Sequence, residues 1–279
     1  MIKFGNTYLK FGNDFITDVY DTNPLRLPWH TIRIKYARGF VPTEGDTQTL
    51  VDAQNNIWDL YIESNDWGGL YDINYYLYPT SSHHQVLEVL GANSEGITGM
   101  NSMFQGCESL SSVALFDTSN VSAMGWTFWN NLTLTAIPPF NTSKVTTLPN
   151  TFTNCRSITS FPNIDTFNVS AMGGTFAGCY KLQSVPTFDT SKVVDFGSTF
   201  ETCSALTSVP LLDVSKATNA DKMFSECVNV TTGAYDLYQR FSAVRPVPNH
   251  NMTFYNCGLS SDTGIQDLMR IPINWTMPL

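Results

Sequence analysis

The sequence predicts a mainly β solenoid with short helical turns, preceded by a small β-rich domain and closed by a C-terminal cap. Two observations support this prediction. Phenylalanine recurs at a step of 24 residues, and several other apolar positions keep the same step. The phenylalanines are Phe104, Phe128, Phe152, Phe176, Phe200 and Phe224. One unit cannot bury its apolar positions alone, so neighbouring units must stack.

The positions three and six residues after each phenylalanine also repeat, and we expect them to lie in the core. The first of these positions holds Cys107, Asn131, Cys155, Cys179, Cys203 and Cys227. The second holds Leu110, Leu134, Ile158, Leu182, Leu206 and Val230. A further apolar pair and an acidic or amide residue complete each unit, as in Val113, Phe116 and Asp117.

Each unit divides into three local patterns. The stretch Leu-x-x-Val-Pro-x-Phe predicts a short strand that enters a turn. The Asp-Thr-Ser that follows is typical of turns and caps, because short polar side chains bond nearby backbone N–H groups. The stretch from Val121 through Met124 to Phe128 steps by three and four, which predicts a short helix or 3₁₀ turn.

All six cysteines fall in the repeat frame when Phe254 and Cys257 are counted as a late, irregular unit. We expect a column of buried free thiols that act as small hydrophobic residues; disulfides are the alternative. The sequence has no Cys-x-x-Cys pair, which argues against zinc and redox motifs. Asn131 replaces cysteine in one unit, so the column does not need a thiol for chemistry.

The repeat resembles the BspA-like leucine-rich repeats. The similarity lies in Met-Phe-x-Gly-Cys-x-Ser-Leu-x-Ser-Val at 103–113 and Phe-Asp-Thr-Ser-x-Val-x-x-Met at 116–124, and it extends over residues 97–230. Such repeats occur in bacterial surface adhesins, mycoplasma lipoproteins and bacteriophage virion proteins. The resemblance implies a leucine-rich-repeat-like solenoid and no catalytic residues.

The flanks resemble, more loosely, repeat proteins encoded by phages and prophages of gut Bacteroidales. These flanking stretches are 31–35, 50–59, 88–93 and 254–257. Asn131, Trp126 and Trp129 are the main departures from the repeat pattern.

The chain divides into four predicted segments, which are an N-terminal arm at 1–28, a small β-rich domain at 29–96, the repeats at 97–230 and a cap at 231–279. The arm either pairs with a neighbouring subunit or forms an ordinary N-terminal strand. Alternation of apolar and polar residues predicts strands at 32–36, 73–77 and 86–90. Short helices are expected at 235–241 and 265–269, in a cap that covers the last coil.

The charge balance narrows the classes of partner. The chain carries 15 basic and 24 acidic residues, a net charge of −9, which disfavours nucleic acid and anionic membrane surfaces. No run of about 18 apolar residues predicts a membrane span. Lys10, Asn13 and Asp14 interrupt any apolar signal segment, so we expect the encoded start to be the mature start.

Enzyme and metal signatures are weak in this sequence, and we expect no enzyme, metal or cofactor. It has neither a Gly-x-Ser-x-Gly elbow nor a Gly-x-x-x-x-Gly-Lys phosphate loop. His83 and His84 are adjacent, and adjacent histidines rarely share a metal. The aspartates at 59, 66 and 72 do not have the spacing of a calcium loop. The aspartate column of the repeats is better explained by turn capping.

Large side chains that interrupt the repeat are the candidate ligand contacts. They are Trp126, Trp129, Arg156 and Tyr180. An exposed tryptophan beside amides could stack on a sugar ring or anchor a protein. Alternatively, the tryptophans fill the space left by the missing cysteine or pack on the adjacent domain.

Three functions follow as hypotheses. The first is a phage virion protein, in a fibre, tail or capsid decoration, that recognises a host surface glycan or protein. In this interpretation the N-terminal region contacts other virion proteins, and a homo-oligomer is compatible with the sequence. The second is a bacterial surface or secreted adhesin. The third, a glycan-degrading enzyme, would require paired carboxylates in a cleft.

Overall fold

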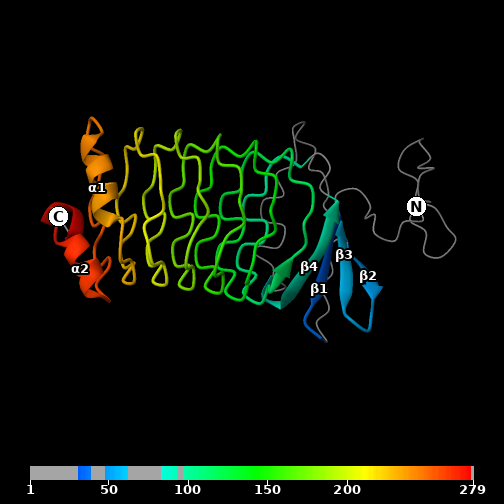
Figure 1. The fold of residues 1–279 in the computed structure, drawn as a ribbon. Helices are drawn as coiled ribbons and strands as arrows, with labels where there is room; N and C mark the ends of the chain where they lie inside the picture. The colour runs from blue at the N-terminus through cyan, green and yellow to red at the C-terminus, as the bar shows by residue number, and fades with distance from the viewer. Residues whose placement is uncertain (1–30, 39–47, 62–82, 94–96, 278–279) are drawn as a thin grey trace.

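The protein is a row of stacked coils with a β-sheet at one end and helices at the other (Figure 1). The computed structural model describes residues 31–38, 48–61, 83–93 and 97–277. The predicted N-terminal arm lies outside these residues. The mainly β solenoid that the sequence predicts is confirmed.

Five strands form one sheet in the order β2-β3-β1-β4-β5. Their bounds are β1 Thr31–Tyr36, β2 Gln48–Asp52, β3 Ile57–Tyr61, β4 Val86–Asn93 and β5 Ser112–Val113, with a short 3₁₀ helix at His83–Gln85. The predicted strands at 32–36 and 86–90 are confirmed, whereas the one at 73–77 lies outside the described residues. The sequence reasoning missed β2 and β3.

The two faces of β1 have opposite character, as its alternation predicted. Ile32, Ile34 and Tyr36 are buried in the core. On the other face, the Arg33 guanidinium donates to both Asp59 carboxylate oxygens at 2.7 and 2.9 Å, and Lys35 Nζ donates to Glu88 Oε1 at 2.6 Å. Cross-strand pairs of this kind help to fix the register of a sheet.

The sheet continues directly into the solenoid through β4 and β5. These two strands pair in parallel, with Glu88 opposite Ser112 and Val89 opposite Val113. The two residues of each pair are 24 residues apart in the sequence. Strand β4 therefore occupies the position that this segment would have in a preceding coil. The 24-residue spacing therefore extends in the structure to β4, and hydrogen bonds cross the predicted domain boundary near residue 96.

One side of every coil forms a continuous surface that we call the turn wall. It consists of residues 99–108, 123–132, 147–156, 171–180, 195–204, 219–228 and 249–258. Alternate backbone N–H groups along the first six segments donate to carbonyls of the next coil. In the first coil, for example, Met100 donates to Ala123 at 2.9 Å, and Phe104 donates to Thr127 at 2.9 Å. Isolated parallel bridges follow the same wall, beginning with Gly99 opposite Ala123.

The short helix or 3₁₀ turn predicted for this segment is wrong. Two equivalent positions have positive φ in every wall segment, which a right-handed helix does not tolerate. The first column is Ser102, Trp126, Asn150, Gly174, Ser198, Lys222 and Met252; the second is Gly106, Asn130, Asn154, Gly178, Thr202, Glu226 and Asn256. This backbone turns alternate N–H groups toward the neighbouring coil.

The predicted strand at Leu-x-x-Val-Pro-x-Phe forms only in the first unit, as β5. Ala114 of that unit donates its N–H to Val89 O at 2.8 Å. Later units place a proline at the equivalent position, namely Pro138, Pro162, Pro186 and Pro210. Proline has no N–H to donate, so this side cannot form a continuous ladder.

The repeated phenylalanines stack through the centre of the molecule. Ring centroids of successive coils lie 5.1 to 6.1 Å apart from Phe104 to Phe254, and the rings are within 21° of parallel. Offset stacking at this separation is favourable for aromatic pairs. The stack therefore links every coil to its neighbours.

Three helices close the solenoid, which are α1 Ala234–Ala243, α2 Asp262–Leu268 and α3 Ile273–Thr276. The helices expected at 235–241 and 265–269 are thereby confirmed. Phe254 donates its N–H to Trp275 O at 2.9 Å, so the cap satisfies a donor of the last coil. Among the described residues, no helix has the length and apolarity to cross a membrane.

Candidate functional site

Trp126 is the most unusual side chain on the turn wall. It is 42 % exposed, and its backbone has φ of 56°. Bulky residues rarely adopt this left-handed conformation, which costs on the order of 1–2 kcal/mol. The wall imposes it, because Trp126 donates its N–H to Pro149 O at 2.9 Å and accepts from Trp129 N at 3.0 Å.

Trp129 belongs to the same turn as Trp126 but is half-buried. Its neighbour Asn130 donates from Nδ2 to Glu108 Oε1 at 2.9 Å, and the other oxygen of Glu108 lies 3.7 Å from His84 Nδ1. This chain of contacts connects the second coil through the first coil to the 3₁₀ helix that precedes β4. The two tryptophans therefore lie on a wall that is held firmly in place.

Arg156 and Tyr180 form a second exposed pair on the wall. The Arg156 guanidinium carbon lies 5.4 Å from the centroid of the Tyr180 ring, within range of a cation–π contact. No ring contact or hydrogen bond among the described residues joins this pair to Trp126 or Trp129. The predicted contacts thus form two pairs on one wall.

Sequence reasoning missed Asn150 and Thr153, which lie on the coil next to Trp126. Thr153 Oγ1 donates its single proton to Gly174 O at 2.6 Å, and it lies 3.2 Å from Asn150 Oδ1. Asn150 follows Trp126 by 24 residues. Comparing the exposed positions of the repeat column by column, in addition to those of the core, would have found it.

The predicted repeat core is buried throughout. Its members are Phe104, Cys107, Leu110, Phe128, Phe152, Cys155, Phe176, Cys179, Leu182, Phe200, Cys203, Leu206, Phe224 and Cys227. All six cysteines are free and buried. They do more than fill space, because Cys155, Cys179, Cys203 and Cys227 donate from Sγ to a phenylalanine carbonyl of the preceding coil at 3.0 to 3.2 Å.

Burial keeps these thiols protonated. It raises the pKa of the Cys179 thiol to about 12, and that of Cys155 well above its usual value. The thiolate is the reactive form of cysteine, so these side chains are poor nucleophiles. Their function in the structure is to donate a weak hydrogen bond across the coils.

Asn131 takes over this role in the coil that has no cysteine. Its Nδ2 donates to Phe104 O at 2.9 Å, the carbonyl that a thiol at this position would use. Its Oδ1, however, is buried without a hydrogen-bond partner among the described residues. An unsatisfied buried acceptor costs about 1–3 kcal/mol.

Replacing Asn131 with cysteine is therefore expected to stabilise the protein by about 1–2 kcal/mol, because the thiol keeps the donor and removes the unsatisfied oxygen. Urea denaturation of the two proteins would measure the change. The reciprocal variant Cys179→Asn serves as the control and should lose stability. Equal midpoints for Asn131→Cys and the wild type would contradict this account of the column.

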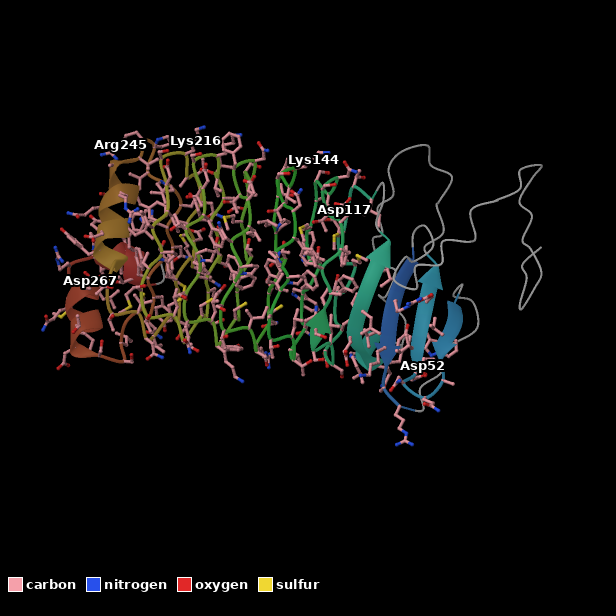
Figure 2. The ribbon with its side chains drawn as sticks, turned by 45° about the vertical axis from the view of Figure 1, so that its right-hand side comes forward. Asp52, Asp117, Lys144, Lys216, Arg245 and Asp267 are labelled. Atoms are coloured by element: carbon pink, nitrogen blue, oxygen red, sulfur yellow. The ribbon has the colours of Figure 1, made fainter. Side chains whose placement is uncertain are left out.

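The aspartate column has the predicted turn-capping geometry. Asp117 Oδ1 accepts from Ser119 N at 2.8 Å, and Asp165, Asp189 and Asp213 accept from the residue two positions later at 2.9 to 3.0 Å. Hydrogen bonds from the Ser191 hydroxyl and N–H lower the pKa of Asp189. Figure 2 shows Asp117, Lys144 and Lys216 along one edge, which we call the loop edge.

The aspartates and histidines considered as metal ligands either make other contacts or lie outside the described residues. Asp59 is bound by Arg33, and Asp66 and Asp72 lie outside the described residues. His250 stacks on Trp275 with centroids 4.2 Å apart. Within the described ranges, no group of three metal-ligating side chains is present.

Stacked 24-residue coils, a buried column of phenylalanines and a terminal cap define a repeat solenoid of the leucine-rich-repeat type. The chain belongs to the family described as "Mycoplasma protein of unknown function, DUF285", whose profile matches residues 76–183 and 150–258. The stacked coils confirm the predicted leucine-rich-repeat-like fold class. No curated protein matches the chain significantly.

Two solved structures are similar to this chain at low identity. A leucine-rich repeat protein from Eubacterium ventriosum shares 18 % identity over 63 % of this chain, with a TM-score of 0.46. The chain spans 44 % of the length of that protein. A leucine-rich repeat protein from Bacteroides ovatus shares 13 % identity over 69 % of this chain and 75 % of its own, with a TM-score of 0.19.

Proposed function

We propose that this chain is a non-enzymatic recognition protein that presents its turn wall to a molecule on a bacterial surface. One observation supports this most directly. Trp126 remains 42 % exposed in a backbone conformation that disfavours a bulky side chain. Every coil has a positive φ at this position, and Trp126 is the one aromatic residue among the described members of the column. The repeat itself therefore does not require a tryptophan here.

The carboxylates of the solenoid support a binding role over hydrolysis. Glycoside hydrolysis requires two carboxyl groups that flank the scissile bond. The loop-edge aspartates are engaged in their own turns. On the turn wall, Glu108 accepts from Asn130 and Glu226 accepts from Asn256 at 3.0 Å.

We further propose that the protein is carried on a bacteriophage particle, as part of a fibre, tail or capsid decoration. The support is the resemblance of the flanking segments to phage-encoded repeat proteins. In this proposal the N-terminal region binds other virion proteins and the solenoid extends outward. A bacterial surface or secreted adhesin is the second candidate, and the mycoplasma origin in the family description favours it.

Mass spectrometry of purified phage particles from the source distinguishes the two candidates. A virion component is expected at tens to hundreds of copies per particle, with the major capsid protein as the internal standard. Absence from the particles, together with detection on the bacterial surface, would overturn the virion proposal and favour the adhesin.

Binding of the fluorescently labelled recombinant protein to intact host cells tests the recognition proposal in either setting. Saturable binding that unlabelled protein displaces is expected. A protein that binds no host cells, while retaining its fold, would contradict recognition itself.

A further inference from the structure

We propose that the wall around Trp126 binds a neutral glycan, with a pyranose ring stacked on the indole. This inference rests on the recognition function proposed above and specifies its ligand. Three features of the described residues support it, which are the fixed backbone of Trp126, the polarity of its neighbours and the donors beside it.

The backbone of Trp126 is set before any ligand arrives. Its N–H bonds to Pro149 O at 2.9 Å, and its carbonyl accepts from Trp129 N at 3.0 Å. The equivalent residues Ser102 and Asn150 have nearly the same φ, 57° and 52° against 56°. Because the backbone is fixed on both sides, binding need not order the chain at this point, which reduces the entropic cost of association.

The neighbours of Trp126 favour a sugar over a protein partner. A protein hot spot normally lies at the centre of a patch that excludes water. The column of Trp126 instead holds the polar residues Ser102 and Asn150 in the two adjoining coils, and Gly174 and Ser198 in the coils beyond Asn150. An exposed aromatic face with polar residues in the adjoining coils matches a pyranose, which has one apolar C–H face and a rim of hydroxyls.

Hydrogen-bond donors for those hydroxyls lie on the next coil. Asn150 Oδ1 lies 3.2 Å from Thr153 Oγ1, and no hydrogen bond from Asn150 Nδ2 is found within the described part of the chain. Asn150 Oδ1 also lies against Gly174, where an added Cβ would come within 2.3 Å of it. The amide is thus held between two coils, with its nitrogen left to donate.

Charge favours a neutral glycan over a polyanionic one. The chain has a net charge of −9. Near the two tryptophans, the charged side chain is that of Glu108, which accepts a hydrogen bond from Asn130. Arg156 lies on the next coil, and its guanidinium faces the Tyr180 ring. A long polyanion would meet net repulsion from such a chain at low ionic strength.

Titration of the full chain with soluble neutral polysaccharides tests this inference. The probes are laminarin, yeast mannan and a galactan, with polygalacturonate as the acidic comparison. We expect at least one neutral polymer to shift the tryptophan emission of the wild type to the blue, as a sugar ring excludes water from the indole. Trp126→Asn should weaken this binding about tenfold or more.

Trp126→Asn is expected to fold, because Asn150 occupies the same column with the same backbone conformation. Trp126→Phe keeps an aromatic face and should retain part of the affinity. Phe167→Ala is the matched control, since Phe167 is an exposed aromatic residue on the loop edge and its loss should leave binding unchanged. Circular dichroism would verify the fold of each variant.

The outcomes separate this inference from the function on which it rests. Wild-type binding to host cells without binding to any neutral polysaccharide would overturn the glycan inference and leave recognition standing. Equal polysaccharide affinity of Trp126→Asn and the wild type would also overturn it, because the indole would then contribute nothing. Preference for polygalacturonate would contradict the neutral character of the ligand.

Discussion

Replacing Phe176 with alanine is expected to destabilise the protein by about 3–5 kcal/mol, the range for removing a buried aromatic ring. Phe176 is fully buried in the middle of the phenylalanine stack. Its ring centroid lies 5.8 Å from that of Phe152 and 5.3 Å from that of Phe200. Phe161 also contacts it edge-on at 4.7 Å. The substitution removes contacts to coils on both sides and leaves a cavity.

The position of Phe176 in the row adds a second consequence. Solenoid stability is approximately a sum of coil stabilities and of interfaces between neighbours. Weakening a central interface should broaden the denaturation transition or split it in two. Urea denaturation followed by circular dichroism would show both the lower midpoint and the change in slope.

Phe167→Ala is the control for this experiment. Phe167 is 53 % exposed, and its main partner is Lys192, whose Nζ lies 3.7 Å from the ring centroid. Losing that contact should cost no more than about 1 kcal/mol. If Phe176→Ala lost only as much stability as Phe167→Ala, the phenylalanine stack would not be what holds the coils together.

Replacing Gly264 with alanine is expected to cost about 3 kcal/mol or more and to release the cap. Gly264 lies in the first turn of α2, where Ser261 Oγ accepts its N–H at 3.1 Å. A Cβ on Gly264 would lie 2.2 Å from Gly258 O and 2.6 Å from Val230 O. Both are backbone atoms of the last coils, so neither can rotate away. Helix α2 must then shift as a whole.

Release of the cap would expose the apolar face and unpaired backbone groups of the last coil, which favours association of exposed edges. Hydrogen exchange should therefore accelerate in residues 249–258 of Gly264→Ala, and the variant should aggregate at lower temperature. Gly173→Ala is the matched control, because the closest atom to its Cβ would be the Asp195 carboxylate, at 3.1 Å, which can move aside. Unchanged exchange in residues 249–258 of Gly264→Ala would contradict the described docking of α2.

The sequence was sufficient to predict the parts of the fold that depend on burial. A core residue must be apolar in nearly every unit, so the 24-residue step by itself identified the columns of Phe152, Cys155 and Ile158. The Asp189 turn was also predictable, because an aspartate two residues before a serine bonds locally. The helices of the cap followed from their own periodicity.

Backbone pairing between coils was not predictable in the same way. The strand expected around Ile137 did not form, because Pro138 next to it lacks a backbone donor. The helix expected from Met124 to Phe128 did not form, because Trp126 adopts a left-handed conformation that a spacing of three and four residues does not reveal. Strands β2 and β3 were missed because no equivalent segment at the 24-residue step identifies them in the sequence.

The candidate site shows the same division. By itself, the sequence determined that Trp126, Trp129, Arg156 and Tyr180 interrupt a repeat, that Asn131 replaces a cysteine, and which family of solenoids the chain resembles. Only the tertiary structure decided that Trp126 is exposed while Trp129 is half-buried, and that Asn131 donates to the carbonyl used by a thiol. The physical reason is that periodicity reports which positions share a burial environment, whereas exposure and hydrogen-bond partners depend on how each coil's backbone meets the next.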